Sequence, residues 1–276
     1  MKGVRRYLLA VAVVVVLVLG SVGIAYAVTG NPQPDEDGHP YVGMVALYNT
    51  ESGEYLGRCS GSLLSPTVFL TAGHCTDGAN LARVWFEPDL SGLSYPYPDC
   101  GPYECIEGTP YTHPDFCIGC AGGLPGFDTH DVGIVVLSEP VTDVGFAALP
   151  TEGLVDTLAM MTDVDLVGYG VQWKIKDGGI PPYYRWTGYR TRFYAPVKLV
   201  ASNHVHSDEY VKLTANPAQG KGGTCFGDSG GPDLLGGTNI VLAVNSYVTS
   251  ANCTGVTYSN RIDAAYALEF INSFLD

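Results

Sequence analysis

Short apolar runs rich in Val, Leu, Tyr and Thr alternate along this chain with clusters of Gly, Pro, Asn and Asp. Runs of this kind between turn residues predict β-strands, and helical periodicity is nearly absent before the C-terminus. The pattern therefore predicts an all-β chain. The expected strands form two sets: residues 41–48, 61–64, 68–72, 82–86 and 132–137, and residues 165–169, 190–199, 210–213 and 240–247.

The two sets are joined by a polar, Pro-containing stretch, residues 138–161. Two similar β units in tandem are expected, with a site in the cleft between them. The end of the chain differs, because Ala267, Phe270, Ile271 and Phe274 follow i, i+3, i+4, i+7 spacing. This spacing predicts a C-terminal helix that begins near Asp263.

Residues 88–127 resist assignment to strands. The segment holds many Gly and Pro residues, four cysteines and few strand-like runs. We interpret it as an extended surface insertion tied by its own disulfides.

The first 27 residues have the form of a secretory signal peptide. Residues 1–6 are basic, residues 7–20 are apolar, and Ala25-Tyr26-Ala27 has the small-x-small form of a cleavage site. A retained membrane anchor is the alternative, because the apolar character persists to Val28 and a span needs about 20 residues. We expect a secreted, extracellular protein, and the leader is compatible with bacterial export.

Charge narrows the possible partners. The 276 residues carry a net charge of −14, and loss of the leader removes Lys2, Arg5 and Arg6 but no acid, which gives −17. Such a surface disfavours nucleic acid and anionic membranes, so membrane association is expected only if the leader is uncleaved. The eight cysteines form an even number, which is typical of export into an oxidising compartment.

The most informative motif is Gly227-Asp228-Ser229-Gly230-Gly231-Pro232. Glycines allow positive φ and close approach of other backbone, so a serine in such a turn can be exposed beside inward-turned N–H groups. Acyl transfer needs this combination of nucleophile and oxyanion donors. His74, with an ordinary pKa of about 6.5, is the candidate base, and Asp131 is the candidate orienting acid. Asp128 is a rival acid, but only Asp131 leads directly into an apolar strand.

Several segments together resemble the chymotrypsin-like (trypsin-like) serine endopeptidases over nearly the whole mature chain. The segments are Cys59-Ser60-Gly61-Ser62-Leu63-Leu64 with Thr71-Ala72-Gly73-His74-Cys75, Asp131 at the start of its strand, Gly168-Tyr169-Gly170, the nine residues from Thr224 to Pro232, and Ser246-Tyr247-Val248. The order His, Asp, Ser along the chain is that family's order.

The resemblance implies two six-stranded antiparallel β-barrels with the active site between them. Residues 28–145 would form the N-terminal barrel, and residues 146–276 the C-terminal barrel with its helix. His74, Asp131 and Ser229 would form the catalytic triad. The backbone N–H groups of Gly227 and Ser229 would form the oxyanion hole.

In the family, the acid before the nucleophile is buried and paired with the ammonium group of a new N-terminus. That acid is Asp228 here, and a buried carboxylate needs a partner. Val28-Thr29-Gly30-Asn31 resembles the family's N-terminal sequence and follows Ala27 directly. We therefore expect an activation ion pair between Val28 and Asp228, created by signal peptidase itself.

The family's primary specificity depends largely on the residue six before the nucleophile, which is Gly223. No acid stands there, so a preference for Arg or Lys lacks its charge partner. Ser246 and Tyr247 resemble the segment that pairs with substrate backbone, and Val248 could narrow the pocket. Small or medium uncharged residues are expected before the scissile bond.

The resemblance also implies the disulfides Cys59–Cys75 and Cys225–Cys253. Cys100, Cys105, Cys117 and Cys120 remain, with three possible pairings that the sequence does not separate. Zinc binding by these four is an alternative, but a secreted chain favours disulfides. No metal and no cofactor are expected.

These observations predict a secreted, monomeric serine endopeptidase that acts on protein or peptide substrates. The alternative is a catalytically silent homologue that serves as an extracellular binding module. The intact triad and glycine-rich turn argue for the enzyme.

Overall fold

The computed structural model describes residues 33–120, 128–171, 173–177, 183–187, 190–202, 207–216, 222–250 and 253–275. The expected signal peptide and Val28 lie outside the described residues. Among the residues described, no helix is long and apolar enough to cross a membrane.

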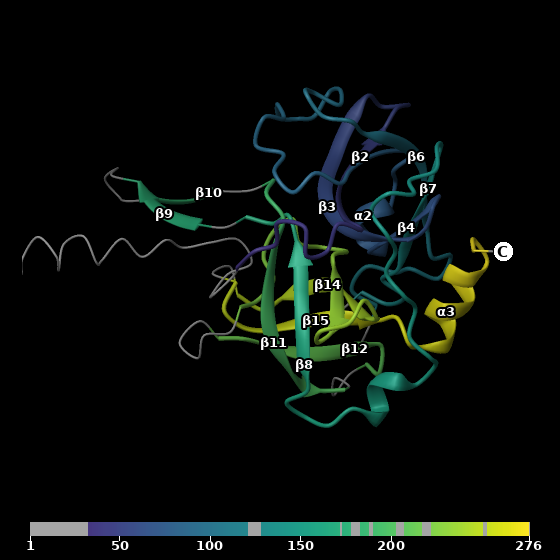
Figure 1. Ribbon diagram of the computed structural model, residues 1–276, viewed down its shortest axis with the longest axis vertical. Coiled ribbons are helices and arrows are strands. Elements are labelled where there is room, and N and C mark those ends of the chain that lie inside the picture. Colours follow the sequence, from purple (N-terminus) through teal and green to yellow (C-terminus); the bar gives the residue numbers. More distant parts are fainter. Residues whose placement is uncertain are drawn as a thin grey trace, which may run out of the picture.

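Six antiparallel strands close the first barrel in the order β2-β3-β4-β7-β6-β5 (Figure 1). Its strands are β2 (Val42–Asn49), β3 (Glu54–Ser65), β4 (Val68–Thr71), β5 (Leu81–Trp85), β6 (Ile106–Thr112) and β7 (Gly133–Leu137). The short helix α2 (Gly73–Thr76) follows β4. The first barrel contains the strands expected from the first set of apolar runs.

The second barrel also closes through six strands, in the order β8-β11-β12-β15-β14-β13, with β13 returning to β8. Its strands are β8 (Asp163–Gly168), β11 (Phe193–Ala201), β12 (Tyr210–Ala215), β13 (Pro232–Leu235), β14 (Val241–Val248) and β15 (Gly255–Arg261). Strand β1 (Gln33–Pro34) adds to β11, while β9 (Trp173–Asp177) and β10 (Tyr183–Thr187) form a separate hairpin (Figure 1). The expected fold of two six-stranded antiparallel barrels is confirmed.

The expectation of a purely surface insertion at residues 88–127 is wrong in part, because this segment contains the barrel strand β6. Strand β6 pairs with β5 and β7 and closes the first barrel. Gly108 and Pro110 are uncommon in strands, so the sequence did not predict β6. Gly108 is nevertheless required, because a Cβ there would lie 2.6 Å from a methyl carbon of Val135. The rest of the segment carries the disulfides Cys100–Cys105 and Cys117–Cys120.

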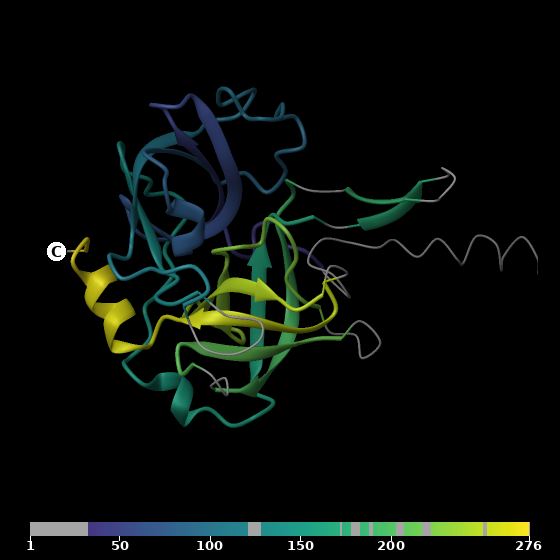
Figure 2. The ribbon, with the colours of Figure 1, turned by 180° about the vertical axis from the view of Figure 1, so that it is seen from behind.

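The C-terminal helix α3 (Ala265–Asn272) follows the second barrel and lies against the first, as both ribbon views show (Figures 1 and 2). Ala267 and Ile271 are buried in the main hydrophobic core. Phe270 packs against His113, with ring centroids 5.0 Å apart. The expected apolar stripe therefore joins the two barrels rather than covering one of them.

A buried guanidinium also joins the barrels. Arg192, just before β11, is 1% exposed and donates to Asp35 at 2.7 Å. It also donates to the carbonyl oxygens of Val42 and Phe86, which belong to the first barrel. Because the bonds to Val42 and Phe86 run from the second barrel to the first, Arg192 helps to fix the orientation of the two barrels relative to each other.

Candidate active site

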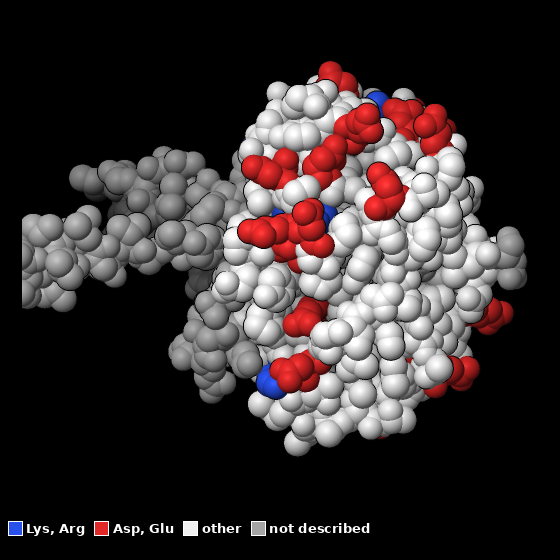
Figure 3. Space-filling model, viewed as in Figure 1, with Lys and Arg blue, Asp and Glu red and all other residues white. Residues whose placement is uncertain are grey.

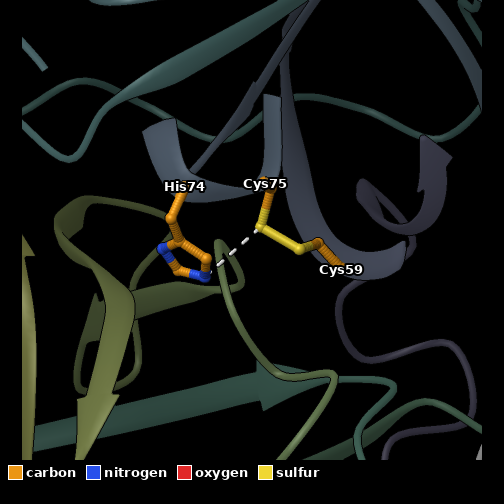
Figure 4. Close-up of side chains that lie close together, drawn as sticks. All are labelled: Cys59, His74 and Cys75. Carbon is orange, nitrogen blue, oxygen red and sulfur yellow. Dashed lines mark hydrogen bonds between the residues drawn. A yellow bond between two sulfur atoms is a disulfide. The ribbon is translucent and has the colours of Figure 1, made fainter. Parts of the chain in front are cut away.

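His74 lies in α2, one turn of helix that follows the buried strand β4. The next residue, Cys75, is bonded to Cys59 of β3. Figure 4 shows the imidazole at the edge of this disulfide, with Nε2 3.7 Å from the Cys75 sulfur. The disulfide therefore anchors the helix that presents His74 to the second barrel.

Asp131, two residues before the start of β7, accepts hydrogen bonds from both the backbone and the ring of His74. The His74 backbone N–H lies 2.7 Å from Oδ1, and the ring atom Nδ1 lies 2.9 Å from Oδ2. The Ser246 hydroxyl of β14, on the second barrel, donates to the same Oδ2. Asp131 is fully buried, so these donors replace the water that its carboxylate has lost.

The contact between His74 and Asp131 shifts the pKa of both side chains. Burial lowers the pKa of His74, but the charge and hydrogen bonds of Asp131 outweigh it, so the net pKa is raised. Burial raises the pKa of Asp131, but the His74 charge and the donors from His74 and Ser246 outweigh that too, so the net pKa is lowered. Asp131 is thus ionised wherever His74 titrates, and its charge stabilises an imidazolium.

Ser229 lies in a turn that needs two glycines. Gly227 has φ of 96° and Gly230 has φ of 75°, a region that L side chains rarely adopt. A Cβ on Gly230 would lie 2.6 Å from the backbone nitrogen of Ala72, which precedes α2. The Ser229 carbonyl accepts from the N–H of Ser60, next to Cys59, at 2.8 Å. These contacts hold the serine turn directly against the segment that carries His74.

The structure brings His74, Asp131 and Ser246 into one hydrogen-bonded chain, but the described residues include no hydrogen bond between the Ser229 hydroxyl and His74. Such bonds are often long without substrate. Within the same described part of the chain, the N–H groups of Gly227 and Ser229 donate to no protein acceptor. Both donors are available to a bound carbonyl oxygen.

The carboxyl of Asp228 is fully buried. It accepts from the N–H of Gly170 at 2.8 Å and of Cys225 at 2.9 Å. Gly170 is required there, because a Cβ would lie 2.3 Å from the carboxylate. Burial raises the pKa of Asp228 to about 6, against the two N–H donors and the charge of Arg58, which lower it.

A pocket of about 210 Å³ opens beside Ser229. Its lining residues come from the serine turn and from β14: Thr224, Cys225, Phe226, Ser229, Asn245, Ser246, Tyr247 and Val248. Gly223 is not among them; it is buried against Ala215, where a Cβ would be only 2.3 Å from the Ala215 Cβ. Cys225 of this pocket is bonded to Cys253.

Sequence reasoning missed two contributors to this site. Asn245 lines the pocket and holds the serine turn, and Phe226 forms part of the wall. Ser246 was expected only to pair with substrate backbone, whereas its hydroxyl also bonds Asp131. Asn245 directly precedes the Ser246-Tyr247-Val248 segment, so its place on the strand could have drawn attention to it.

Two groups of side chains come close enough together to suggest a metal site within the described segments: Cys59, His74 and Cys75, and His74, Asp128 and Asp131. The first offers no thiolate, because its cysteines form a disulfide. In the second, both oxygens of Asp131 already accept hydrogen bonds. The geometry therefore favours a hydrogen-bonded acid–base pair at His74.

The face drawn in Figure 3 bears carboxylates over both barrels and few lysine or arginine side chains. This distribution agrees with the net charge of −14. A surface of this kind repels polyanions.

Comparison with known proteins gives one family. The family model described as "Trypsin" matches residues 27–271. Brachyurin from Leptuca pugilator is 29% identical over 222 residues, which are 78% of this chain and 86% of that protein. Kallikrein 1-related peptidase b21 from Mus musculus is 25% identical over 230 residues, or 76% of each chain.

Two further similarities cover different extents. Glutamyl endopeptidase from Bacillus licheniformis is 28% identical over 149 residues, which are 49% of this chain and 40% of that protein. Among solved structures, HL collagenase superposes with a TM-score of 0.64 at 17% identity, covering 89% of this chain and 97% of its own. At that identity the superposition supports the fold alone.

Proposed function

Because the chain belongs to the trypsin family of serine endopeptidases, we propose that Ser229, His74 and Asp131 are its catalytic triad. The observation that carries the proposal is the contact of His74 with buried Asp131 next to the glycine-bounded turn of Ser229. Fold, order of residues and pocket all support the same assignment. The reaction is hydrolysis of a peptide bond through an acyl-enzyme.

In the proposed mechanism, the Ser229 Oγ attacks the carbonyl carbon of the scissile bond while His74 Nε2 takes its proton. The oxyanion that forms accepts from the N–H groups of Gly227 and Ser229. His74 then returns the proton to the leaving amine, and the acyl-enzyme remains. Water attacks the acyl carbon in the second half, again with His74 as base, and Ser229 regains its proton.

Asp131 acts through His74. Its bond to Nδ1 keeps the proton on that nitrogen and leaves Nε2 free to accept from Ser229. Its negative charge stabilises the imidazolium that forms in both halves of the reaction. The Ser246 hydroxyl of the second barrel donates to Asp131, and Ser246 also lines the pocket, so this bond holds His74 and Asp131 in place beside the pocket.

We propose further that the mature enzyme begins at Val28 and that its α-ammonium pairs with Asp228. The argument rests on Asp228: a fully buried carboxyl whose pKa is raised to about 6 gains most from a cationic partner. Gly168 and Gly170 leave room around that carboxyl, where Cβ atoms would lie within 2.4 Å of its oxygens. The pair would hold Asp228, and with it the N–H of Gly227, in the arrangement that binds an oxyanion.

Replacement of Asp228 by asparagine is expected to lower kcat about 10²- to 10³-fold, the cost of one oxyanion donor lost through disorder of Gly227. N-terminal sequencing of the active wild-type protein should begin at Val28. A variant with one extra residue before Val28 should lose activity to a similar degree, since the ammonium group no longer reaches. A fully active enzyme with another N-terminus would rule out the pair.

We propose that the pocket accepts small or medium uncharged side chains before the scissile bond. None of its eight lining residues is acidic, so an Arg or Lys side chain would be desolvated without a counter-charge. A peptide library should therefore show cleavage after uncharged residues, with kcat/KM for Arg and Lys lower by a factor of about 10 or more. Cleavage dominated by Arg or Lys would contradict this.

The proposed setting is extracellular, with protein or peptide substrates and a monomeric enzyme. The four disulfides support an oxidising compartment. The acidic surface supports solubility outside the cell rather than attachment to an anionic membrane.

A further inference from the structure

Asp233 lies four residues after Ser229, on β13 in the wall of the second barrel, and it is fully buried. Among the residues that the structure describes, none forms a hydrogen bond with either carboxylate oxygen. Its direct neighbours across the sheet are apolar, Leu166 on β8 and Ala243 on β14. An acid in this position plays no part in the proposed mechanism and calls for another explanation.

The surroundings of Asp233 favour its neutral form. Burial raises the pKa of Asp233 well above its usual range, Ser259 opposes this, and the negative charge of Asp228 raises it further. The charged form of a buried carboxylate without a partner is strongly disfavoured, because it has lost its water and gained no counter-charge. A neutral carboxylic acid is instead a hydrogen-bond donor, and it needs an acceptor.

Register places that acceptor on the same interior face. Asn245 of β14 stands two residues beyond Ala243, and Ser259 of β15 is its direct partner. Side chains two apart on a strand share a face, so Asp233, Asn245 and Ser259 point into the same part of the barrel. The Ser259 hydroxyl lies 3.5 Å from Asn245 Oδ1. A series of hydrogen bonds can therefore run from Asp233 through the Ser259 hydroxyl to Asn245.

Asn245 connects this series of hydrogen bonds to the serine turn and the pocket. Its backbone N–H and its Nδ2 both donate to the carbonyl of Gly231, at 2.9 and 3.1 Å. Its own carbonyl accepts from the N–H of Gly230 at 2.7 Å. The same residue lines the pocket beside Ser229. Asn245 therefore belongs both to the buried polar chain and to the wall that meets the substrate.

We propose that Asp233 and Ser259 are positioning residues that fix the carboxamide of Asn245 as a hydrogen-bond donor in the specificity pocket, so that the enzyme prefers glutamine over an apolar side chain of equal size before the scissile bond. Ser259 accepts from the neutral acid and donates to Asn245 Oδ1. Nδ2 then keeps one N–H on Gly231. Its second N–H finds no acceptor among the residues described, and so remains for substrate.

The pocket also distinguishes glutamine from glutamate. None of its lining residues is cationic, so a carboxylate would lose its water without gaining an ion pair. A glutamine side-chain carbonyl needs only the N–H of Asn245. The favoured class is thus uncharged side chains that end in an acceptor, which narrows the preference for small or medium uncharged residues.

This inference rests on the proposed function, and the test separates the two. Labelling of the mature enzyme by a fluorophosphonate probe reports Ser229 reactivity and does not depend on the side chain before the scissile bond. Peptide substrates that differ only in Gln, Met or Glu at that position then report the pocket. We expect kcat/KM for Gln to exceed that for near-isosteric Met about five-fold, the value of one hydrogen bond, and to exceed that for Glu as well.

Three variants test the buried hydrogen bonds between Asp233, Ser259 and Asn245. Ser259→Ala and Asp233→Leu should each reduce the Gln-to-Met ratio about five-fold, to near unity. Asp233→Asn should keep the ratio, because its amide N–H still donates to Ser259. Ser62→Ala is the matched control, since Ser62 is an equally buried serine of the first barrel, and its ratio should not change.

The outcomes are distinct. A protein that takes no probe contradicts the proposed function itself. A labelled enzyme that prefers Met or Glu, or whose ratio is unchanged in Ser259→Ala, overturns the role of Asp233 and Ser259. Because Ser259→Ala removes a single hydroxyl, it gives this answer even if Asp233→Leu fails to fold.

Discussion

Replacement of Ser229 by alanine is expected to lower kcat by about 10⁶, the loss seen when a serine triad loses its nucleophile. Without Oγ no acyl-enzyme can form, and water must attack the peptide directly. Substrate binding should change little, because the pocket wall and the N–H groups of Gly227 and residue 229 remain. Peptide hydrolysis and covalent labelling by a fluorophosphonate are the two measurements.

The control is Ser91→Ala, which removes a hydroxyl from an exposed loop of the first half of the chain. Both variants should have the thermal stability of the parent, and only Ser229→Ala should lose the label. A wild-type protein that takes no label would favour the silent homologue that binds without cleaving. Label retained in Ser229→Ala would place the nucleophile elsewhere.

Replacement of Asp131 by asparagine has the next largest expected effect. In the trypsin family's reference enzyme the corresponding change lowers kcat about 10⁴-fold, and a loss of the same order is expected for this chain. The physical reason is visible in this chain: an asparagine amide that donates to Nδ1 would move the His74 proton to Nε2, which could then no longer accept from Ser229. Steady-state kinetics at neutral pH measure the loss.

The pH profile gives a second readout. Activity needs neutral His74, and the Asp131 charge raises the pKa of His74, so kcat/KM should fall as pH drops through a value above the usual 6.5 or so. Asp131→Asn removes that charge, and the acid limb should move to lower pH while the plateau falls. An unmoved limb would contradict the pairing.

Asp128→Asn is the matched control, because Asp128 is the rival acid three residues earlier. Its charge raises the pKa of His74 less than Asp131 does, and it forms no hydrogen bond with the imidazole among the described contacts. The variant should keep its plateau and show only a small shift of the acid limb in the same direction. A loss as large as that of Asp131→Asn would make Asp128 the orienting acid.

Local patterns in the sequence were enough to predict much of this fold. Alternating or continuous apolar runs identified strands such as β2 and β4, whose side chains are almost all buried. The spacing of Ala267 and Ile271 identified α3. These predictions succeeded because the spacing of apolar residues within one short segment is enough to predict which of its faces is buried.

Other strands could not be predicted because distant contacts decide them. Strand β6 contains Gly108 and Pro110 and becomes a strand only by pairing with β5 and β7. Strand β15 carries Thr257, Ser259 and Asn260, polar side chains that the barrel nevertheless buries. Local composition argues against strands at both places, and closure of the barrels overrides it.

The sequence by itself was enough to predict the family of this protein, because the glycine-rich serine turn, the histidine segment and the aspartate before an apolar strand are each patterns of neighbouring residues. Only the tertiary structure decided that Ser246 anchors Asp131 and that Asn245 lines the pocket. It also decided that Asp233 is fully buried and shares an interior face of the second barrel with Asn245. Strand register between β13, β14 and β15 creates these contacts, and register depends on closure of the whole barrel rather than on any single segment.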